Sequence, residues 1–441
     1  MKVLFISLGC DKNLVDSEVM LGLLAEKGYQ MTDDETEAEV IVINTCCFIH
    51  DAKEESIQTI LEMAEYKKEG TLKALIVTGC LAQRYQQEIL DEIPEVDEVL
   101  GTTSYPEIVD AIENALRGRA EVRMTDIDAL PLVDTARQVT TGGHFAYLKI
   151  AEGCDKHCTY CIIPKIRGNY RSVPMERLIK EAKGLAEKGV KELILVAQET
   201  TLYGKDLYGE KSLHRLLKEL CRISGIRWIR ILYCYPEEID DNLIQVMKEE
   251  PKICHYVDLP IQHANTDILK RMGRRTSKEQ LEEIIGKLRR EIPDIAIRTT
   301  LITGFPGETE EQHQELVDFV DEMEFDRLGV FTYSPEEDTP AAEMEGQIPE
   351  EVKEDRQAEI MELQQEIAFE QAEDMVGKEV LVMIEGKVAD ENAYVGRTYK
   401  DAPNVDGLIF VNTEEELMSG DFARVKVTGA AEYDLIGELI S

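Results

Sequence analysis

The stretch Gly153-Cys154-Asp155-Lys156-His157-Cys158-Thr159-Tyr160-Cys161 contains three cysteines in the spacing Cys-x3-Cys-x2-Cys. Three thiolates on one short loop can hold three irons of a four-iron cluster and leave the fourth iron open to a small molecule. The alternative is a structural zinc site, but such sites usually take four ligands from two paired knuckles, and no second knuckle follows here. His157 could supply a fourth ligand, although its place between two cysteines would strain the loop. The spacing therefore favours iron–sulfur chemistry with an open iron.

Length and composition limit the class of protein. A chain of 441 residues predicts two to four domains, and 43% hydrophobic with 31% charged residues is typical of a soluble globular protein. No apolar run approaches the ~20 residues that cross a bilayer, and residues 1–6 enter a strand pattern without a signal-peptide cleavage site. We therefore expect a cytoplasmic protein. Its ten cysteines then predict ligands or buried thiols rather than disulfides.

The chain is strongly acidic. It carries 49 basic and 88 acidic residues, which gives a formal charge of -39. Such a charge repels a polyanion unless basic residues are locally concentrated. The composition therefore disfavours nucleic acid as a partner and favours a strongly basic protein.

The first 118 residues alternate between apolar strands and helical patterns. Buried strands that are separated by helices predict a doubly wound parallel sheet. We predict strands at 3–8, 40–44 and 74–78 and helices at 17–27, 53–68 and 82–93.

A segment with little periodicity, 119–143, is interpreted as a linker to a second domain over 144–374. Six strand–helix units are too few to close an eight-unit barrel, so a partial (β/α)6 barrel is predicted, with its active face at the carboxyl ends of the strands. The predicted strands are 146–150, 192–198, 228–235, 256–262, 296–303 and 327–333, and the helices include 175–188, 212–223, 277–290 and 309–323.

A charged helix over about 350–375 leads into a third domain, 375–441, of different character. Short strands separated by turns rich in Gly, Asn and Asp predict a small antiparallel barrel. The predicted strands are 379–384, 394–395, 408–411, 423–427 and 435–436.

Cys10, Cys46 and Cys80 each follow one of the three N-terminal strands. The carboxyl ends of parallel strands lie on one edge of a sheet, where such folds bind ligands, so these thiols are predicted to converge on a second metal site. A single cysteine at a strand end would more often be a buried core residue. Cys46 is preferred over its neighbour Cys47, because it keeps the Asn-Thr-Cys spacing. The remaining cysteines, Cys221, Cys234 and Cys254, are assigned to the core.

The domain order and its motifs resemble the radical S-adenosylmethionine (SAM) methylthiotransferases over essentially the whole chain. The motifs stand at 7–10, 44–46, 79–80, 153–161 and 304–308, and the adjacent Cys47 is a departure from the pattern. The resemblance implies a TRAM domain at the carboxyl end and two [4Fe-4S] clusters. One would be held by Cys154, Cys158 and Cys161 and bind SAM at its open iron. The other, on Cys10, Cys46 and Cys80, would hold the sulfur that is transferred.

The resemblance also suggests residues that contact SAM. Gln198 and Glu199 end the second barrel strand, and Glu199 is expected to meet the SAM amino group. Gly304 and Gly307 flank a turn after the fifth strand, where missing side chains would let the backbone approach the adenosyl group. Further candidates are a basic group, Lys165, Arg167 and Arg171, which would contact a carboxylate or be solvated, and His263 with Arg271.

Members of the family modify either adenosine in tRNA, as the MiaB type does, or the β-carbon of an aspartate in ribosomal protein uS12. Residues 376–441 contain six basic and thirteen acidic residues, which suits a basic ribosomal protein better than RNA. Segments 162–168 and 196–203 also resemble the ribosomal-protein branch. We therefore predict uS12 as substrate, with an electron donor such as flavodoxin or ferredoxin. A non-enzymatic iron–sulfur carrier is the alternative from another class, although carriers normally ligate each cluster with four cysteines.

Overall fold

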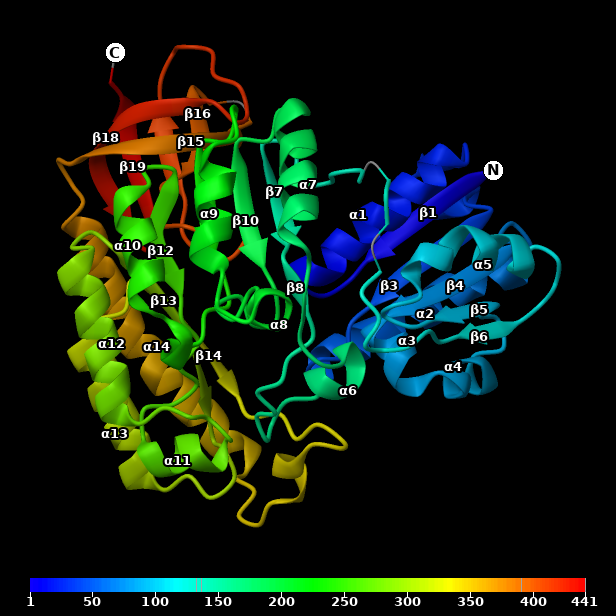
Figure 1. The fold of residues 1–441 in the computed structure, drawn as a ribbon, viewed down its shortest axis with the longest axis horizontal. Coiled ribbons are helices and arrows are strands. Elements are labelled where there is room, and N and C mark those ends of the chain that lie inside the picture. Colours follow the sequence, from blue (N-terminus) through cyan, green and yellow to red (C-terminus); the bar gives the residue numbers. More distant parts are fainter. Residues whose placement is uncertain (132, 136, 390, 441) are drawn as a thin grey trace. The chain divides into compact units, whose positions relative to one another are not determined.

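The computed structural model describes residues 1–131, 133–135, 137–389 and 391–440. Leu132 and Ala136 of the predicted linker, and Asp390 and Ser441 of the predicted third domain, lie outside the described residues. The chain forms two compact units (Figure 1). The first comprises Met1–Thr140, Lys149–Val173 and Glu336–Thr339, and the second comprises Thr141–Leu148, Pro174–Pro335 and Pro340–Ser441. Both sets of three cysteines therefore belong to the first unit.

The first unit contains a six-stranded parallel sheet in the order β2-β1-β3-β4-β5-β6, which confirms the predicted doubly wound sheet. Its strands are β1 (Lys2–Ser7), β2 (Gln30–Thr32), β3 (Val40–Thr45), β4 (Ala74–Gly79), β5 (Glu98–Leu100) and β6 (Glu121–Arg123). The prediction of a linker was wrong at β6, because Glu121–Arg123 pairs with β5 and Val122 packs on the core.

Helices cover both faces of this sheet because side chains alternate along each strand. Val40 and Val42 pack with α1 (Asp11–Glu26) and α5 (Ile108–Ala115). Ile41 and Ile43 pack on the other face. The helices on that face are α2 (His50–Glu69), α3 (Cys80–Tyr85) and α4 (Gln87–Glu92). The predicted helix 82–93 is broken between α3 and α4, where Gln86 has a φ of 45°.

The second unit contains an open six-stranded sheet in the order β14-β13-β12-β11-β10-β7, which confirms the partial barrel. The pairings of β10 through β14 are parallel. The strands are β7 (Phe145–Lys149), β10 (Glu192–Val196), β11 (Trp228–Ile231), β12 (Ile253–Asp258), β13 (Ala296–Thr303) and β14 (Arg327–Thr332). The main helices between them are α7 (Met175–Glu187), α9 (Leu213–Cys221), α10 (Asp241–Glu249), α12 (Lys278–Glu291) and α13 (Glu310–Met323).

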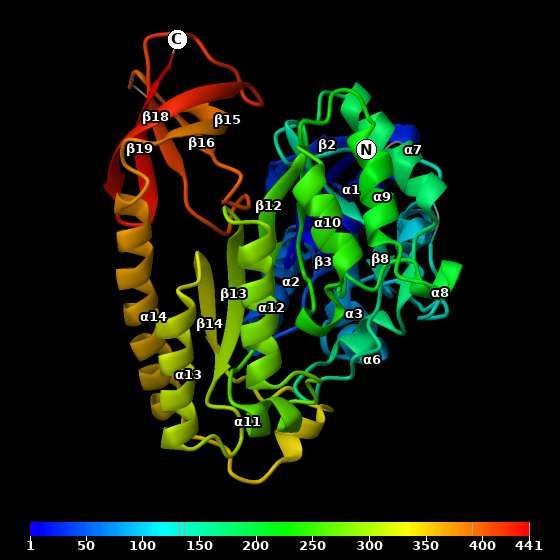
Figure 2. The ribbon, with the colours of Figure 1, turned by 60° about the vertical axis from the view of Figure 1, so that its left-hand side comes forward.

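A 24-residue helix, α14 (Glu350–Glu373), packs beside α13 and β14 and leads into a closed barrel (Figure 2). The order around the barrel is β15-β16-β17-β19-β18. Four junctions are antiparallel as predicted, and β17 pairs with β19 in parallel. The strands are β15 (Glu379–Lys387), β16 (Ala393–Arg397), β17 (Ile409–Asn412), β18 (Phe422–Ala431) and β19 (Asp434–Leu439).

Buried ion pairs join this barrel to the first residue of β10. The Glu192 carboxylate lies 2.8 Å from Nε of Arg230 and 2.7 Å from Nη2 of Arg397, and all three side chains are fully buried. Burial by itself would raise the pKa of Glu192, but the two guanidinium groups outweigh it, so the pKa is lowered. The packing of the barrel on the sheet of the second unit therefore includes the negative charge of Glu192, which has no contact with water.

Within the described ranges, no helix is both long and apolar enough to cross a membrane.

Candidate active site

The parallel sheet of the first unit brings Cys10, Cys46 and Cys80 to one edge, as predicted. Strands β1, β3 and β4 are neighbours, so their carboxyl ends lie side by side. Cys10 directly precedes α1, Cys46 follows β3, and Cys80 is the first residue of α3. Cys46 and Cys80 are buried, whereas Cys10 is exposed. The three thiols are thus presented from three segments that are remote in sequence.

Two glycines allow these strand ends to approach one another. Gly9 has a φ of +85°, and a Cβ there would lie 2.6 Å from Cβ of Cys46 and 2.9 Å from its sulfur. Gly79 has a φ of +93°, and a Cβ there would lie 2.6 Å from the carbonyl oxygen of Thr45. Since atoms cannot approach so closely, a side chain at position 9 would displace Cys46, and one at position 79 would displace the end of β3 just before Cys46. The glycines that precede Cys10 and Cys80 are therefore part of the site.

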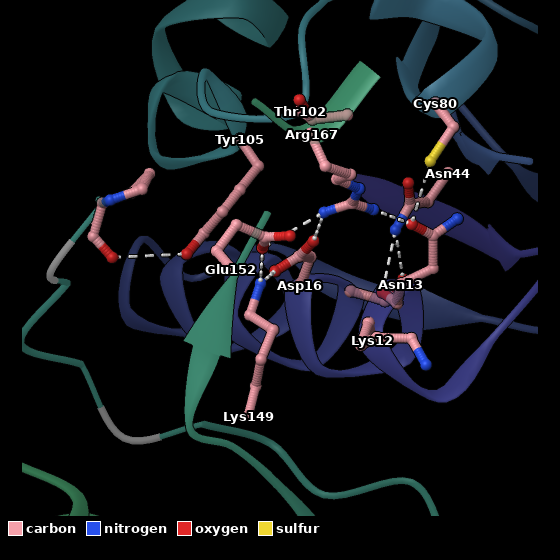
Figure 3. A network of polar contacts seen from close by, with 12 residues as sticks. Lys12, Asn13, Asp16, Asn44, Cys80, Thr102, Tyr105, Lys149, Glu152 and Arg167 are labelled. Atoms are coloured by element: carbon pink, nitrogen blue, oxygen red, sulfur yellow. Dashed lines mark hydrogen bonds and ion pairs between the residues drawn. The ribbon is translucent and has the colours of Figure 1, made fainter. Parts of the chain in front are cut away.

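Asn13 ties the same edge together from the first turn of α1 (Figure 3). Its side-chain amide donates to the carbonyls of Leu8, at 3.1 Å, and Thr45, at 2.8 Å. Its Oδ1 lies 3.8 Å from the sulfur of Cys80. One buried side chain thus contacts the segments that carry all three cysteines. The sequence gives no signal for this role, because an asparagine early in a helix is common.

Cys46 and Cys47 have different surroundings. Cys47 is fully buried in the apolar layer between the sheet and helices α2 to α4, and burial raises its pKa to about 12. Cys46 adjoins Gly9, and its backbone N–H donates to the hydroxyl of Ser56 at 3.0 Å. Burial raises the pKa of Cys46 as well, so a metal that binds there displaces a proton. This geometry supports Cys46 as the ligand and Cys47 as a core residue.

The loop with Cys154, Cys158 and Cys161 is closed at its base by a short ribbon. Strands β8 (Ala151–Glu152) and β9 (Arg171–Ser172) pair in antiparallel fashion. Above them, the N–H of Cys154 donates to the carbonyl of Gly168 at 3.1 Å. A Cβ at Gly153 would lie 2.1 Å from the carbonyl oxygen of Asn169, so only glycine fits there. The base of the loop is therefore fixed by backbone contacts.

The donor sets fit iron–sulfur clusters better than a single ion. Within the described part of the chain, no three His, Cys, Asp or Glu side chains are arranged to hold one metal ion. A four-iron cluster differs because each cysteine binds its own iron. His157 is exposed and has a φ of +53°, whereas Cys154 and Cys158 are buried, which disfavours the histidine as a fourth ligand. Each set thus offers three soft thiolate donors, which suit a cluster.

The predicted SAM residues lie in the second unit, after two strands of its parallel sheet. Glu199 follows β10 and is fully buried, and its Oε1 accepts the N–H of Thr201 at 2.9 Å and the hydroxyl of the same residue. Gln198 beside it is half-buried. Gly304 follows β13, so both segments lie at the carboxyl edge of the sheet. This is the edge at which open parallel sheets bind ligands.

The turn after β13 is held by Glu308. Both oxygens of this buried carboxylate lie 3.2 Å from the N–H of Gly304. The same carboxylate contacts Nη1 of Arg356 at 2.8 Å and Nε2 of His263 at 3.2 Å. His263 thus supports the turn, a role that the sequence did not indicate.

The glycines of this turn have a different explanation from the predicted one. A Cβ at Gly304 would lie 2.3 Å from Cγ of Lys353, and a Cβ at Gly307 would lie 2.3 Å from Nη1 of Arg271. Side chains of the protein itself therefore fill the space that was predicted to admit the adenosyl group. Contact of these glycines with SAM stays a prediction.

The predicted basic group does not form a solvated patch. Lys165 is exposed, 3.8 Å from a carboxylate oxygen of Asp338. Arg171 donates to the carbonyl of Arg167 at 3.0 Å. Arg167 itself is only 2% exposed and contacts carboxylates inside the first unit. The other three cysteines, Cys221, Cys234 and Cys254, are buried as predicted.

Three family profiles match successive parts of the chain. An uncharacterized protein family, UPF0004, matches residues 2–101, the radical SAM superfamily matches 148–320, and the TRAM domain matches 376–440. With the thiol loop and the six-stranded parallel sheet, these matches define a radical SAM enzyme that uses iron–sulfur chemistry.

Similarity to curated proteins identifies the family within this class of enzymes. The ribosomal protein uS12 methylthiotransferase RimO of Lachnoclostridium phytofermentans is 68% identical over 99% of both chains. The RimO protein of Desulfitobacterium hafniense is 50% identical over 100% of this chain and 98% of its own. The chain belongs to the RimO family of radical SAM methylthiotransferases.

Solved structures share the fold at low sequence identity. The radical SAM methyltransferase TsrM from Kitasatospora setae, with cobalamin and a [4Fe-4S] cluster bound, is 15% identical, with a TM-score of 0.56 and coverage of 77% of this chain and 76% of that one. The cobalamin-dependent radical enzyme OxsB is 13% identical, with a TM-score of 0.52 and coverage of 82% and 56%. At this identity the likeness concerns the fold alone.

Proposed function

We propose that the protein adds a methylthio group to the β-carbon of an aspartate in ribosomal protein uS12. The observation that carries the proposal is the presence of two separate sets of three thiols in one compact unit. A single open cluster would suffice for radical chemistry, whereas the second set gives the chain a place for the transferred sulfur. The full-length similarity to uS12 methylthiotransferases supports the same substrate.

In this proposal Cys154, Cys158 and Cys161 hold one [4Fe-4S] cluster, and Cys10, Cys46 and Cys80 hold another. When bound, the first cluster with SAM supplies one-electron radical chemistry, and the second supplies the sulfur. The backbone contacts of Gly153 and Cys154 fix the first loop, and Gly9, Asn13 and Gly79 hold the strand ends of the second site together.

The chain also positions SAM in this proposal. The buried carboxylate of Glu199 would face the SAM amino group, and Gln198 would lie beside it. Glu308 keeps the turn from Gly304 to Gly307 in place. Holding the reactants in one orientation is the main contribution that a protein makes to cofactor-based chemistry.

The charge of the chain supports a basic protein substrate. A formal charge of -39 attracts a cationic ribosomal protein and repels the phosphates of tRNA. A flavodoxin or ferredoxin as electron donor stays a prediction.

The test is an anaerobic assay with reconstituted enzyme, SAM and dithionite. One arm contains unmodified uS12 and the other contains unmodified tRNA, and mass spectrometry detects replacement of hydrogen by a methylthio group. We expect product on uS12 only. Product on tRNA alone would overturn the choice of substrate.

Adjacent cysteines supply a matched control for the second site. Cys46→Ala is expected to abolish methylthiolation while 5′-deoxyadenosine still forms from SAM at the loop cluster. Cys47→Ala removes a thiol from the neighbouring core position and is expected to keep the product. Full product from Cys46→Ala would refute the assignment of the second cluster.

A further inference from the structure

One buried side chain, Arg167, reaches from the segment after the cysteine loop toward the strand-edge site that contains Cys80 (Figure 3). Helix α6 (Ile163–Arg167) begins shortly after Cys161, and its last residue points toward the edge that carries Cys80. The guanidinium of Arg167 donates through Nη2 to Oδ1 of Asn13 and through Nη1 to Oδ2 of Asp16, at 2.9 Å. The helix that follows the cysteine loop is therefore joined by direct hydrogen bonds to helix α1, which begins after Cys10.

Arg167 belongs to a balanced group of buried charges. Nη1 of Arg167 also lies 3.3 Å from Oε2 of Glu152, and Nζ of Lys149 lies 2.7 Å from the same oxygen. Lys149 contacts Asp16 as well. Two cations thus face two carboxylates, and each of these side chains is at most 10% exposed. Removal of the arginine would leave an excess of buried negative charge, which is unfavourable. The two carboxylates therefore hold its guanidinium in place.

The same arginine lies close to the N-terminal thiols. Oδ1 of Asn13 accepts its hydrogen bond and is also 3.8 Å from the sulfur of Cys80. Only one side chain therefore separates the guanidinium from a proposed cluster ligand. At such range in a buried site, a unit charge interacts strongly with charge on the cluster, since water screens it little.

We propose that Arg167 is a positioning residue for the cluster on Cys10, Cys46 and Cys80, and that its buried positive charge raises the reduction potential of that cluster. The inference rests on the proposed function for the existence of this cluster. Net charge and nearby hydrogen bonds are the main protein contributions to the potential of iron–sulfur clusters. A positive charge favours the reduced form, because reduction adds an electron.

An arginine is suited to this place because of its planar fork. Two of its nitrogens reach Asn13 and Asp16 at once from a rigid planar group, whereas the ammonium of a lysine is a single point charge on a flexible chain. Arg167→Lys would keep the charge and lose the fork, whereas Arg167→Gln would lose both. The two variants therefore separate the electrostatic role from the purely structural one.

The test uses the full-length chain with Cys154, Cys158 and Cys161 replaced by Ala, so that any cluster is the N-terminal one. Iron content and electron paramagnetic resonance (EPR) first establish that this cluster is present. The midpoint potential of the cluster is then measured by EPR-monitored redox titration. The proteins compared are this parent variant and the same variant with Arg167→Gln, Arg167→Lys or Lys165→Gln added. Lys165 is the matched control, since it is an exposed cation on the same helix.

We expect Arg167→Gln to shift the midpoint potential to more negative values, Arg167→Lys to keep it close to the value of the parent variant, and Lys165→Gln to leave it unchanged. Loss of iron from Arg167→Gln with retention in Arg167→Lys would also support the role of the charge. An unchanged potential in Arg167→Gln, or equal loss of iron from both variants, would overturn it. Absence of any cluster in the parent variant would instead refute the proposal of a second cluster.

Discussion

The carboxylate of Glu308 accepts the backbone N–H of Gly304, with 3.2 Å from the nitrogen to each oxygen. The acid thereby closes the turn at the carboxyl end of β13, where the sheet is expected to bind SAM. Burial by itself would raise the pKa of Glu308, but its contacts with His263, Gly304 and Arg356 outweigh it, so the pKa is lowered. The turn is therefore held by a charged group rather than a neutral one.

Glu308→Gln is expected to loosen this turn, because an amide cannot replace the charged acceptor. The loss of hydrogen bonds to a charged group should cost about 2 kcal/mol of unfolding free energy and raise the KM for SAM more than it lowers kcat. Urea unfolding and initial rates of SAM cleavage measure the two effects. Glu310→Gln is the control, since Glu310 also contacts Arg356, at 3.2 Å, but is exposed. Equal effects of both substitutions would contradict the role of Glu308.

Replacing Glu192 should destabilise the second unit. Glu192→Gln leaves Arg230 buried without its anion and removes one of the two carboxylates that contact Arg397, the other being Glu385, and breaking a buried pair typically costs about 3–5 kcal/mol. Urea unfolding should show this loss, while Glu219→Gln, in an exposed pair with Arg222, should leave the midpoint unchanged. A loss no greater than that of the surface control would refute the importance of the buried charge.

The same carboxylate predicts a pH dependence. The pKa of Glu192 is lower in the folded protein than in the unfolded chain, so its stabilising effect is present above the unfolded pKa and is lost as pH falls through the folded pKa. The unfolding free energy of the wild type should thus fall more steeply between about pH 5 and about pH 3 than that of Glu192→Gln. Urea midpoints across this range provide the measurement. Parallel curves would show that Glu192 does not contribute to acid sensitivity.

Gly9→Ala should prevent assembly of the N-terminal cluster. The new methyl group would collide with Cys46, whereas Gly28 has nearly the same φ, +83°, and no atom within 4 Å of the place that a methyl group would take. Both substitutions incur a backbone cost of about 1–2 kcal/mol, so the difference between them isolates the collision. We expect Gly9→Ala to lose about half of the reconstituted iron and Gly28→Ala to keep all of it. An undiminished iron content in Gly9→Ala would count against a cluster at the strand-edge site.

The convergence of Cys10, Cys46 and Cys80 could be predicted because it depends only on topology: adjacent parallel strands end on the same edge. Strands β5 and β6 were missed, since three residues are too few to show a period. The role of Arg167 was not predictable either. Its partner Asn13 is 154 residues away, and local sequence gives no indication of which acid or amide a cation will meet. Long-range side-chain contacts of this kind are fixed by packing rather than by pattern.

The unit that holds both cysteine sets is assembled from three separate chain segments, the last of which is Glu336–Thr339. Arg84 contacts Glu336 across 252 residues. During synthesis, therefore, the first unit cannot reach its final contacts until more than three quarters of the chain has emerged from the ribosome. Contacts between residues so distant in sequence form slowly, and we expect the cysteines to remain free thiols in the nascent chain until then. Cluster insertion is thus expected only after residues 336–339 have emerged, and truncation before residue 336 should yield an iron-poor protein even though all six of these cysteines are present.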